Sequence, residues 1–106
     1  MPKRRVLGEE ISTEAQRALT ALNATSRLET LLFFKRHPFS TRQDLVAETN
    51  LGFGTSKYAL EDLEALGYLV PQLQPGSNKP YRPMRYSLDR TRLASDLGDL
   101  MALVLG

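Results

Sequence analysis

The first half of the chain carries apolar side chains at the spacing of amphipathic α-helices. Thr13 with Gln16 three residues later has the form of a capping box, which satisfies free N–H groups at a helix start. The apolar positions of this segment recur every three or four residues. They are Ile11, Ala15, Ala18, Leu19 and Leu22. The pattern therefore predicts a first helix that begins near Thr13 and ends before Asn23.

A second helix is predicted between Ser26 and Pro38. Ser26 and Glu29 have the form of another capping box at its start. The apolar positions behind it are Leu28, Leu31 and Leu32. Pro38 lacks an N–H group and restricts the residue before it, so we expect this helix to end at His37.

A third and a fourth helix are predicted on either side of a tight turn. Ser40 or Thr41 can cap the third helix with its hydroxyl group. The turn covers residues 50–54, and Thr55 then opens the fourth helix. The apolar positions of the fourth helix, which lie on one face, are Ala59, Leu60, Leu63 and Leu66. Gly67 follows them at the place of a C-terminal cap.

The pattern changes after Gly67, where Tyr68 begins an extended run and repeated prolines exclude a helix as far as about residue 89. We expect a β-hairpin with its tip at residues 75–78 and a return strand that ends in Leu88. Prolines at this density fit exposed edge strands. Asp89 or Thr91 then caps a last helix. Its apolar stripe consists of Leu93, Leu97, Leu100, Met101, Val104 and Leu105.

The composition fits one domain in a reducing compartment. A chain of 106 residues that is 42% hydrophobic can bury one core but is short for two. The absence of cysteine excludes disulfides and thiolate chemistry. No apolar run reaches the roughly 18 residues that a membrane span needs, and the basic start of the chain lacks the apolar part of a secretory signal. We therefore expect a soluble cytoplasmic protein without a membrane partner.

Positive charge is concentrated in two short segments, although the net charge is only +2. Residues 1–8 carry +3 and residues 71–92 carry +4, whereas residues 9–70 carry −3 and residues 93–106 carry −2. Nucleic-acid binding follows local basic patches rather than the total charge. The predicted hairpin is thus the strongest electrostatic feature, and the basic start is interpreted as a flexible arm.

Four segments carry a more specific signal. They are TSRL at 25–28, STRQDL at 40–45, GTSKYALEDLEALGYL at 54–69 and YSL at 86–88. In this order they resemble winged helix-turn-helix regulators of the ArsR and MarR type. The resemblance implies a mainly α fold with a small β-hairpin, in which a three-helix core carries a wing and a C-terminal dimerisation helix. It also implies sequence-specific binding of double-stranded DNA as a homodimer, in transcriptional regulation and as a repressor.

The resemblance divides the chain into a flexible basic arm at 1–10, a winged helix DNA-binding domain at 11–90 and a dimerisation helix at 91–106. The residues expected to contact DNA come from three places: the start of the third helix, the fourth or recognition helix, and the wing. They are Arg42, Gln43, Thr55, Ser56, Lys57, Tyr58, Lys79, Arg82 and Arg85. Base edges in the major groove present distinct patterns that a helix can read, and basic wing residues suit the phosphates.

Three features of the sequence keep other interpretations open. Glu61 and Asp62 on the recognition helix would repel phosphates, unless one of them accepts a hydrogen bond from a cytosine amine or both stay clear of the DNA. The polar residues of this helix are alternatively ordinary solvated side chains. The wing cations alternatively only prevent an exposed edge strand from pairing with neighbours.

The last helix is the candidate dimer interface because its apolar stripe is wider than one small domain needs. The expected interface residues are Leu93, Leu97, Leu100, Met101 and Val104. The alternative is that the stripe packs on the first helix of the same chain. Gly98 costs this helix about 1 kcal/mol relative to alanine, which suggests a close helix crossing.

An enzyme is not expected, because the only histidine, His37, has no cysteine partner and residues 52–54 are too short for a dinucleotide-binding loop. We expect no cofactor and no metal, and the sequence does not identify a small-molecule effector. A winged helix that contacts other proteins in a larger assembly remains an alternative function. A DNA-docking role in plasmid or phage control is another.

Overall fold

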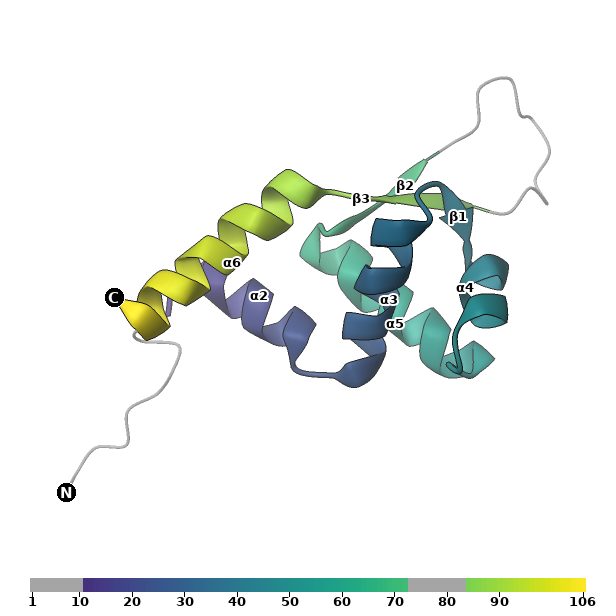
Figure 1. Cartoon of the computed structure of the whole chain (residues 1–106), viewed down its shortest axis with the longest axis horizontal. Helices are drawn as coiled ribbons and strands as arrows, with labels where there is room; N and C mark the ends of the chain where they lie inside the picture. The colour runs from purple at the N-terminus through teal and green to yellow at the C-terminus, as the bar shows by residue number, and fades with distance from the viewer. Residues whose placement is uncertain (1–10, 73–83) are drawn as a thin grey trace.

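The computed structural model describes residues 11–72 and 84–106, which form five helices and one small sheet (Figure 1). In chain order, the elements are α2 (Thr13–Leu22), α3 (Thr25–Arg36), β1 (Ser40–Thr41), α4 (Arg42–Glu48), α5 (Phe53–Leu66), β2 (Leu69–Gln72), β3 (Arg85–Leu88) and α6 (Arg90–Leu105). The expected basic arm at 1–10, the hairpin tip at 75–78, Lys79 and Arg82 lie outside the described residues.

The helix starts agree with the sequence in two cases. The Thr41 hydroxyl accepts a hydrogen bond from the Asp44 N–H at 3.2 Å, and the Asp44 carboxylate accepts one from the Thr41 N–H at 3.0 Å. This reciprocal capping box begins α4. The Asp89 carboxylate accepts from the Arg92 N–H at 3.0 Å and caps α6. Both starts were expected, because each places a side-chain oxygen before an apolar helical pattern.

Three other helix starts differ from the expectation. Ser12, one residue before the predicted start, caps α2 by accepting from the Ala15 N–H at 3.1 Å. The second helix begins at Thr25 after Ala24, which makes no side-chain cap, so the predicted capping box at Ser26 is wrong. The recognition helix begins two residues before Thr55, with Gly52 as its N-cap.

A turn with a left-handed residue ends α5. Gly67 has φ +86°, a conformation that residues with a Cβ atom rarely adopt, and this confirms its predicted place at the helix end. The Gly67 N–H donates to the Glu64 carbonyl and the Tyr68 N–H donates to the Leu63 carbonyl, each at 3.0 Å. The turn therefore leads the chain directly into β2.

The sheet has three antiparallel strands in the order β1-β3-β2. The predicted hairpin is confirmed by the β2 and β3 pairing, in which Leu69 faces Leu88 and Gln72 faces Arg85. Pro71 lies on β2, an edge strand, where its missing N–H group removes no central ladder bond. The strand β1 was not predicted, because its two residues pair with β3 through backbone groups.

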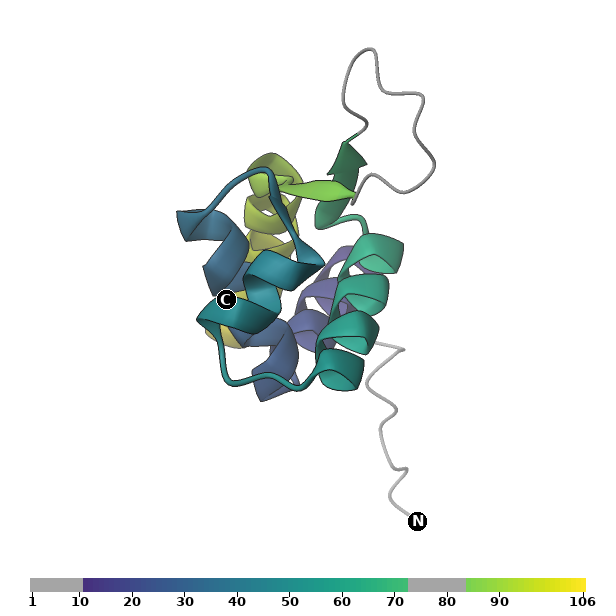
Figure 2. The same cartoon turned by 90° about the vertical axis from the view of Figure 1, so that its right-hand side faces the viewer.

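The core lies between α2, α3, α4, α5 and the sheet. Figure 2 shows the arrangement of these elements end-on. Its buried residues are Ala21, Leu31, Phe33, Phe34, Leu45, Leu60, Leu63, Tyr68 and Leu69. The Phe34 ring meets the Phe33 ring edge to face at 5.0 Å and the Tyr86 ring at 5.9 Å. These aromatic contacts join α3 to the central strand, so the helix-turn-helix pair and the wing strands share one hydrophobic core.

Candidate nucleic-acid interface

The recognition helix α5 buries one face and exposes the other. The buried side chains are Ser56, Ala59, Leu60 and Leu63. Thr55, Lys57 and Tyr58 are exposed, with 65% of the Tyr58 surface accessible. Ser56 has no accessible surface, and its hydroxyl donates to the Phe53 carbonyl at 2.8 Å. Ser56 is therefore removed from the expected set of DNA-contacting residues, because its hydroxyl closes the first turn of the helix from inside.

The start of α4 is tied to the start of α5. The guanidinium carbon of Arg42 lies 4.1 Å from the centre of the Phe53 ring, a cation–π contact between the two helices. Gln43 beside it is exposed. The contact holds a positive charge next to the N-terminal half of α5. Arg42 was expected from the sequence but Phe53 was not, because Phe53 lies in the segment predicted as a turn, two positions before Thr55.

Arg85 lies at the base of the wing on the central strand. Its position faces Thr41 on one side and Gln72 on the other. One of its guanidinium nitrogens donates to the Phe39 carbonyl at 2.9 Å. Phe39 has φ +63°, and its N–H donates to the Tyr86 carbonyl at 3.0 Å. Arg85 thus has a structural role at the turn before β1 in addition to the charge that it places beside α4.

Acidic residues on α5 point in different directions. The Asp62 carboxylate pairs with the Arg27 guanidinium on α3 at 3.1 Å. The same guanidinium donates to the Thr20 carbonyl at 2.9 Å, which fixes the arginine between α2 and α3. The Asp62 carboxylate therefore lies at one edge of α5, where Arg27 compensates its negative charge. Glu61 is exposed and forms no hydrogen bond or ion pair with the described residues.

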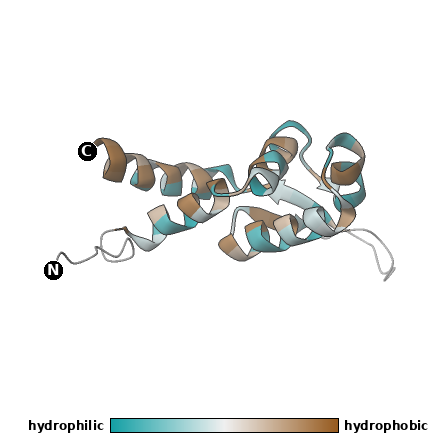
Figure 3. Ribbon diagram, turned by 90° about the horizontal axis from the view of Figure 1, so that it is seen from below, coloured by the Kyte–Doolittle hydropathy of each residue, from teal (hydrophilic) through white to brown (hydrophobic). Residues whose placement is uncertain are grey.

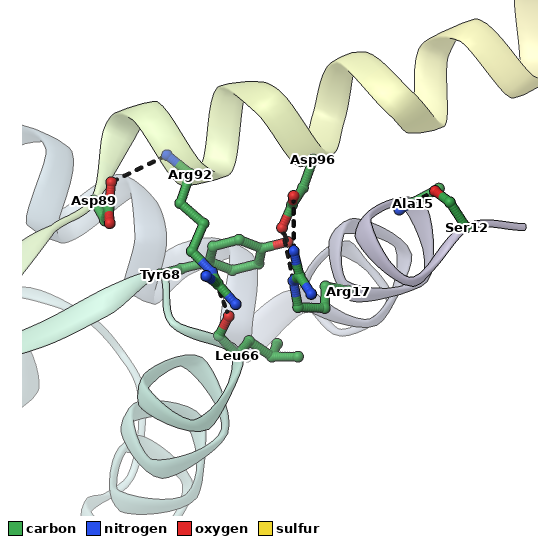
Figure 4. A network of polar contacts seen from close by, with 8 residues as sticks. All are labelled: Ser12, Ala15, Arg17, Leu66, Tyr68, Asp89, Arg92 and Asp96. Carbon is green, nitrogen blue, oxygen red and sulfur yellow. Dashed lines mark hydrogen bonds and ion pairs between the residues drawn. The ribbon is translucent and has the colours of Figure 1, made fainter.

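A buried polar network joins α2, α6 and the start of the wing (Figure 4). The Asp96 carboxylate on α6 accepts from Arg17 Nε at 2.9 Å, from Arg17 Nη2 at 3.1 Å and from the Tyr68 hydroxyl at 2.7 Å. Only 2% of Asp96 and none of Tyr68 is accessible. The hydrogen bonds from Arg17 hold the pKa of Asp96 below its usual value despite burial. Burial, and then the Asp96 carboxylate, raises the pKa of the Tyr68 phenol.

This network was not expected from the sequence. Arg17, Tyr68 and Asp96 are separated by up to 79 positions, and a charged residue beside an apolar stripe does not by itself predict burial. A weak signal was present: Asp96 occupies the same helical face as Leu93 and Leu100. The network fixes how α6 lies on α2, and it connects that arrangement to the residue that leads into β2.

The expected dimer stripe on α6 divides into two parts. Leu93 packs against the core, and Leu97 and Leu100 are half-buried. Met101 is 57% exposed and Val104 is 72% exposed. In Figure 3 the ribbon of α6 has the colour of hydrophobic residues at its C-terminal end. The alternative of packing within the chain therefore accounts for the first part of the stripe, which lies beside α2.

The described residues contain neither a candidate metal site nor a helix that could cross a membrane. Among residues 11–72 and 84–106, no group of three or more histidine, aspartate or glutamate side chains is placed to hold a metal ion. Within the same ranges, no helix combines the length and the apolar character that crossing a membrane requires.

A comparison with solved structures identifies the fold. No protein-family model and no curated protein matches the sequence. Among solved structures, the chain is similar to a crystal structure of a MarR family transcription regulator, with a TM-score of 0.60 and 17% sequence identity. The similarity covers 92% of this chain, which spans 65% of the length of that regulator. The chain therefore has a MarR-like winged helix-turn-helix fold, as its sequence predicted.

Proposed function

We propose that this chain is a sequence-specific, non-enzymatic DNA-binding protein that regulates transcription as a homodimer, as a repressor on the chromosome. The observation that supports this function best is the exposed N-terminal half of α5. Lys57 and Tyr58 project from it, and Arg42 stands beside it in contact with Phe53. A helix with exposed donors and an adjacent fixed cation suits the major groove, because side chains there read base edges while cations meet phosphates.

The phosphate contact is tested by salt dependence. Binding of the full chain to a pool of duplex DNA is measured by fluorescence anisotropy over a range of salt concentrations. Arg42→Ala should reduce the slope of log affinity against log salt by about one unit for each lost phosphate contact. The control is Lys35→Ala, which removes one exposed charge from the last turn of α3. Equal slopes for all three proteins would refute the assignment of Arg42.

Base contacts are tested by comparing specific with random DNA. Lys57→Ala and Tyr58→Phe should narrow the affinity difference between the two by about 1 to 3 kcal/mol for each good base contact. Equal losses on both kinds of DNA would assign these residues to the backbone instead. Lys79 and Arg82 remain predictions from the sequence, and their replacement by alanine should weaken binding to all duplexes.

The dimer is proposed to form through the exposed end of α6. Two winged helices together read a longer, palindromic site than one alone. Met101→Glu with Val104→Glu introduces charges where the single chain exposes its side chains, so the fold should be retained while the dimer is lost. Sedimentation should report a monomer with unchanged helical circular dichroism. A wild-type monomer at tens of micromolar would refute the dimer and leave the DNA assignment in place.

A second function is supported by one observation. Glu61 and Glu64 are exposed on α5, and their negative charge disfavours close approach to phosphates. A winged helix that binds a basic protein surface would use the same face. The salt titration separates the two functions, since a chain that binds no duplex at any salt concentration would favour protein contact.

A further inference from the structure

The centre of the exposed face of α5 carries an acidic side chain. An α-helix turns by about 100° for each residue. The buried positions on α5 are Ser56, Ala59, Leu60 and Leu63. The positions directly opposite this buried face are Gly54, Tyr58, Glu61 and Ala65. Glu61 therefore lies in the middle of the surface that a DNA groove would meet, between a large aromatic side chain and a small one.

Three acidic residues on α5 are distinguished by their surroundings. Asp62 lies at the α3 edge, where Arg27 compensates its charge at 3.1 Å. Glu64 lies toward the opposite edge, and its charge, like that of Glu61 to a smaller extent, acts on the phenol of Tyr86 on β3. Glu61 is exposed between these edges, and the described residues offer it neither a hydrogen bond nor an ion pair. No intramolecular contact among the described residues therefore accounts for a carboxylate at this position.

The chemistry of the major groove selects a base for such a carboxylate. A carboxylate only accepts hydrogen bonds, and guanine presents acceptors at N7 and O6. Adenine presents the N6 donor next to the N7 acceptor, whereas cytosine presents the N4 amine as a donor without an adjacent acceptor. Cytosine is therefore the base from which a glutamate accepts a hydrogen bond most favourably. Lys57, one turn earlier, can donate to a guanine on the paired strand.

We infer that Glu61 is a specificity-determining residue that accepts a hydrogen bond from the N4 amine of a cytosine in the major groove. One C·G pair at a fixed position in each half-site is then required for tight binding. A glutamate also disfavours non-specific binding, because without the amine its charge faces phosphates and acceptors. This inference rests on the proposed DNA-binding function and names the base that the site selects.

The test selects binding sites from a library of randomised duplexes with the full wild-type chain and three variants. Wild type should enrich cytosine at one position of each half-site. Glu61→Ala should lose a preference of roughly 5- to 150-fold at that position alone. Glu61→Gln should shift the preference to adenine, because an amide pairs with adenine N6 and N7. The matched control Glu64→Gln removes the same charge one turn away and should retain cytosine.

The results of this selection distinguish a failure of the Glu61 contact from a failure of DNA binding itself. A cytosine preference that survives in Glu61→Ala, or a wild-type site without a required cytosine, would overturn the role of Glu61 and leave DNA binding intact. A wild-type chain that enriches no duplex would overturn the proposed function, and the inference with it. Circular dichroism of each variant should match wild type, since the Glu61 and Glu64 side chains are exposed.

Discussion

Replacing Asp96 with alanine tests whether the buried network holds α6 to the rest of the fold. The carboxylate accepts three hydrogen bonds, and each hydrogen bond to a charged group contributes about 1.5 to 3 kcal/mol. The Arg17 side chain is 22% exposed and can turn to water when Asp96 is absent, which lowers the cost. The fully buried Tyr68 hydroxyl loses its partner, at a cost of about 1 to 3 kcal/mol. We therefore expect Asp96→Ala to lower the free energy of unfolding by about 3 kcal/mol.

The same variant has a characteristic pH dependence. The folded-state pKa of Asp96 lies below its unfolded value of about 3.9, so its stabilisation is complete above roughly pH 5. That stabilisation is lost as the pH falls through the folded pKa, and the difference between wild type and Asp96→Ala should shrink there. Tyr68 behaves in the opposite way. Its folded pKa is raised, so its contribution is present below about pH 10 and is lost as the pH rises toward the folded pKa.

The assay is urea unfolding followed by circular dichroism, with Tyr68→Phe and the double variant as companions. Tyr68→Phe removes one hydrogen bond and leaves Asp96 paired with Arg17, so we expect a loss of about 1 to 2 kcal/mol. The double variant should lose about 1 kcal/mol less than the sum of the single losses, because it contains no orphaned hydroxyl. A loss below about 1 kcal/mol for Asp96→Ala, constant from pH 3 to pH 7, would refute the network as a stabilising contact.

Three further substitutions test single elements by urea unfolding. Thr41→Ala should cost about 1 kcal/mol because it removes the cap of α4, and an unchanged midpoint would mean that Asp44 alone sustains the helix start. Gly67→Ala should cost about 1 to 2 kcal/mol because φ is +86° and the new Cβ atom would come within 2.5 Å of Arg92 Nε. Gly98→Ala should gain about 1 kcal/mol, since its Cβ atom meets nothing within 4 Å in the single chain; a loss of dimer in sedimentation would place a partner helix there.

The helices could be predicted from the sequence because their determinants are local. Hydrophobic spacing identified all five described helices, and Pro38 and Gly67 marked two of their ends. The starts were less certain, because several neighbouring residues can serve as a cap. Ser12 and Thr13 both carry hydroxyl groups, and in the structure it is Ser12 that lies outside the helix and accepts from the Ala15 N–H. Ser26 has the right side chain, but the helix already includes it and its carbonyl accepts from the Thr30 hydroxyl at 2.8 Å.

Contacts between residues that are distant in the sequence could not be predicted from its local patterns. The two residues of β1 carry no periodicity, so their pairing with β3 depends on where the turn at Phe39 directs the chain. The ion pair of Asp62 with Arg27 spans 35 positions, and it compensates the charge of one acidic residue on the recognition helix. Before the fold is known, Glu61 and Asp62 are equivalent. Afterwards only Glu61 stands in the centre of the exposed face with its charge uncompensated by the described residues.

The last helix shows why periodicity alone leaves packing within the chain and packing between chains unresolved. Apolar residues at spacings of three and four define a face but not its partner. The α2 helix covers the part of α6 that contains Leu97, and Asp96 anchors that contact through Arg17. The exposed side chains of Met101 and Val104 extend the stripe to the end of α6 (Figure 3). Charges placed at these two positions should therefore affect association without affecting the fold, whereas a charge at Leu97 should affect folding as well.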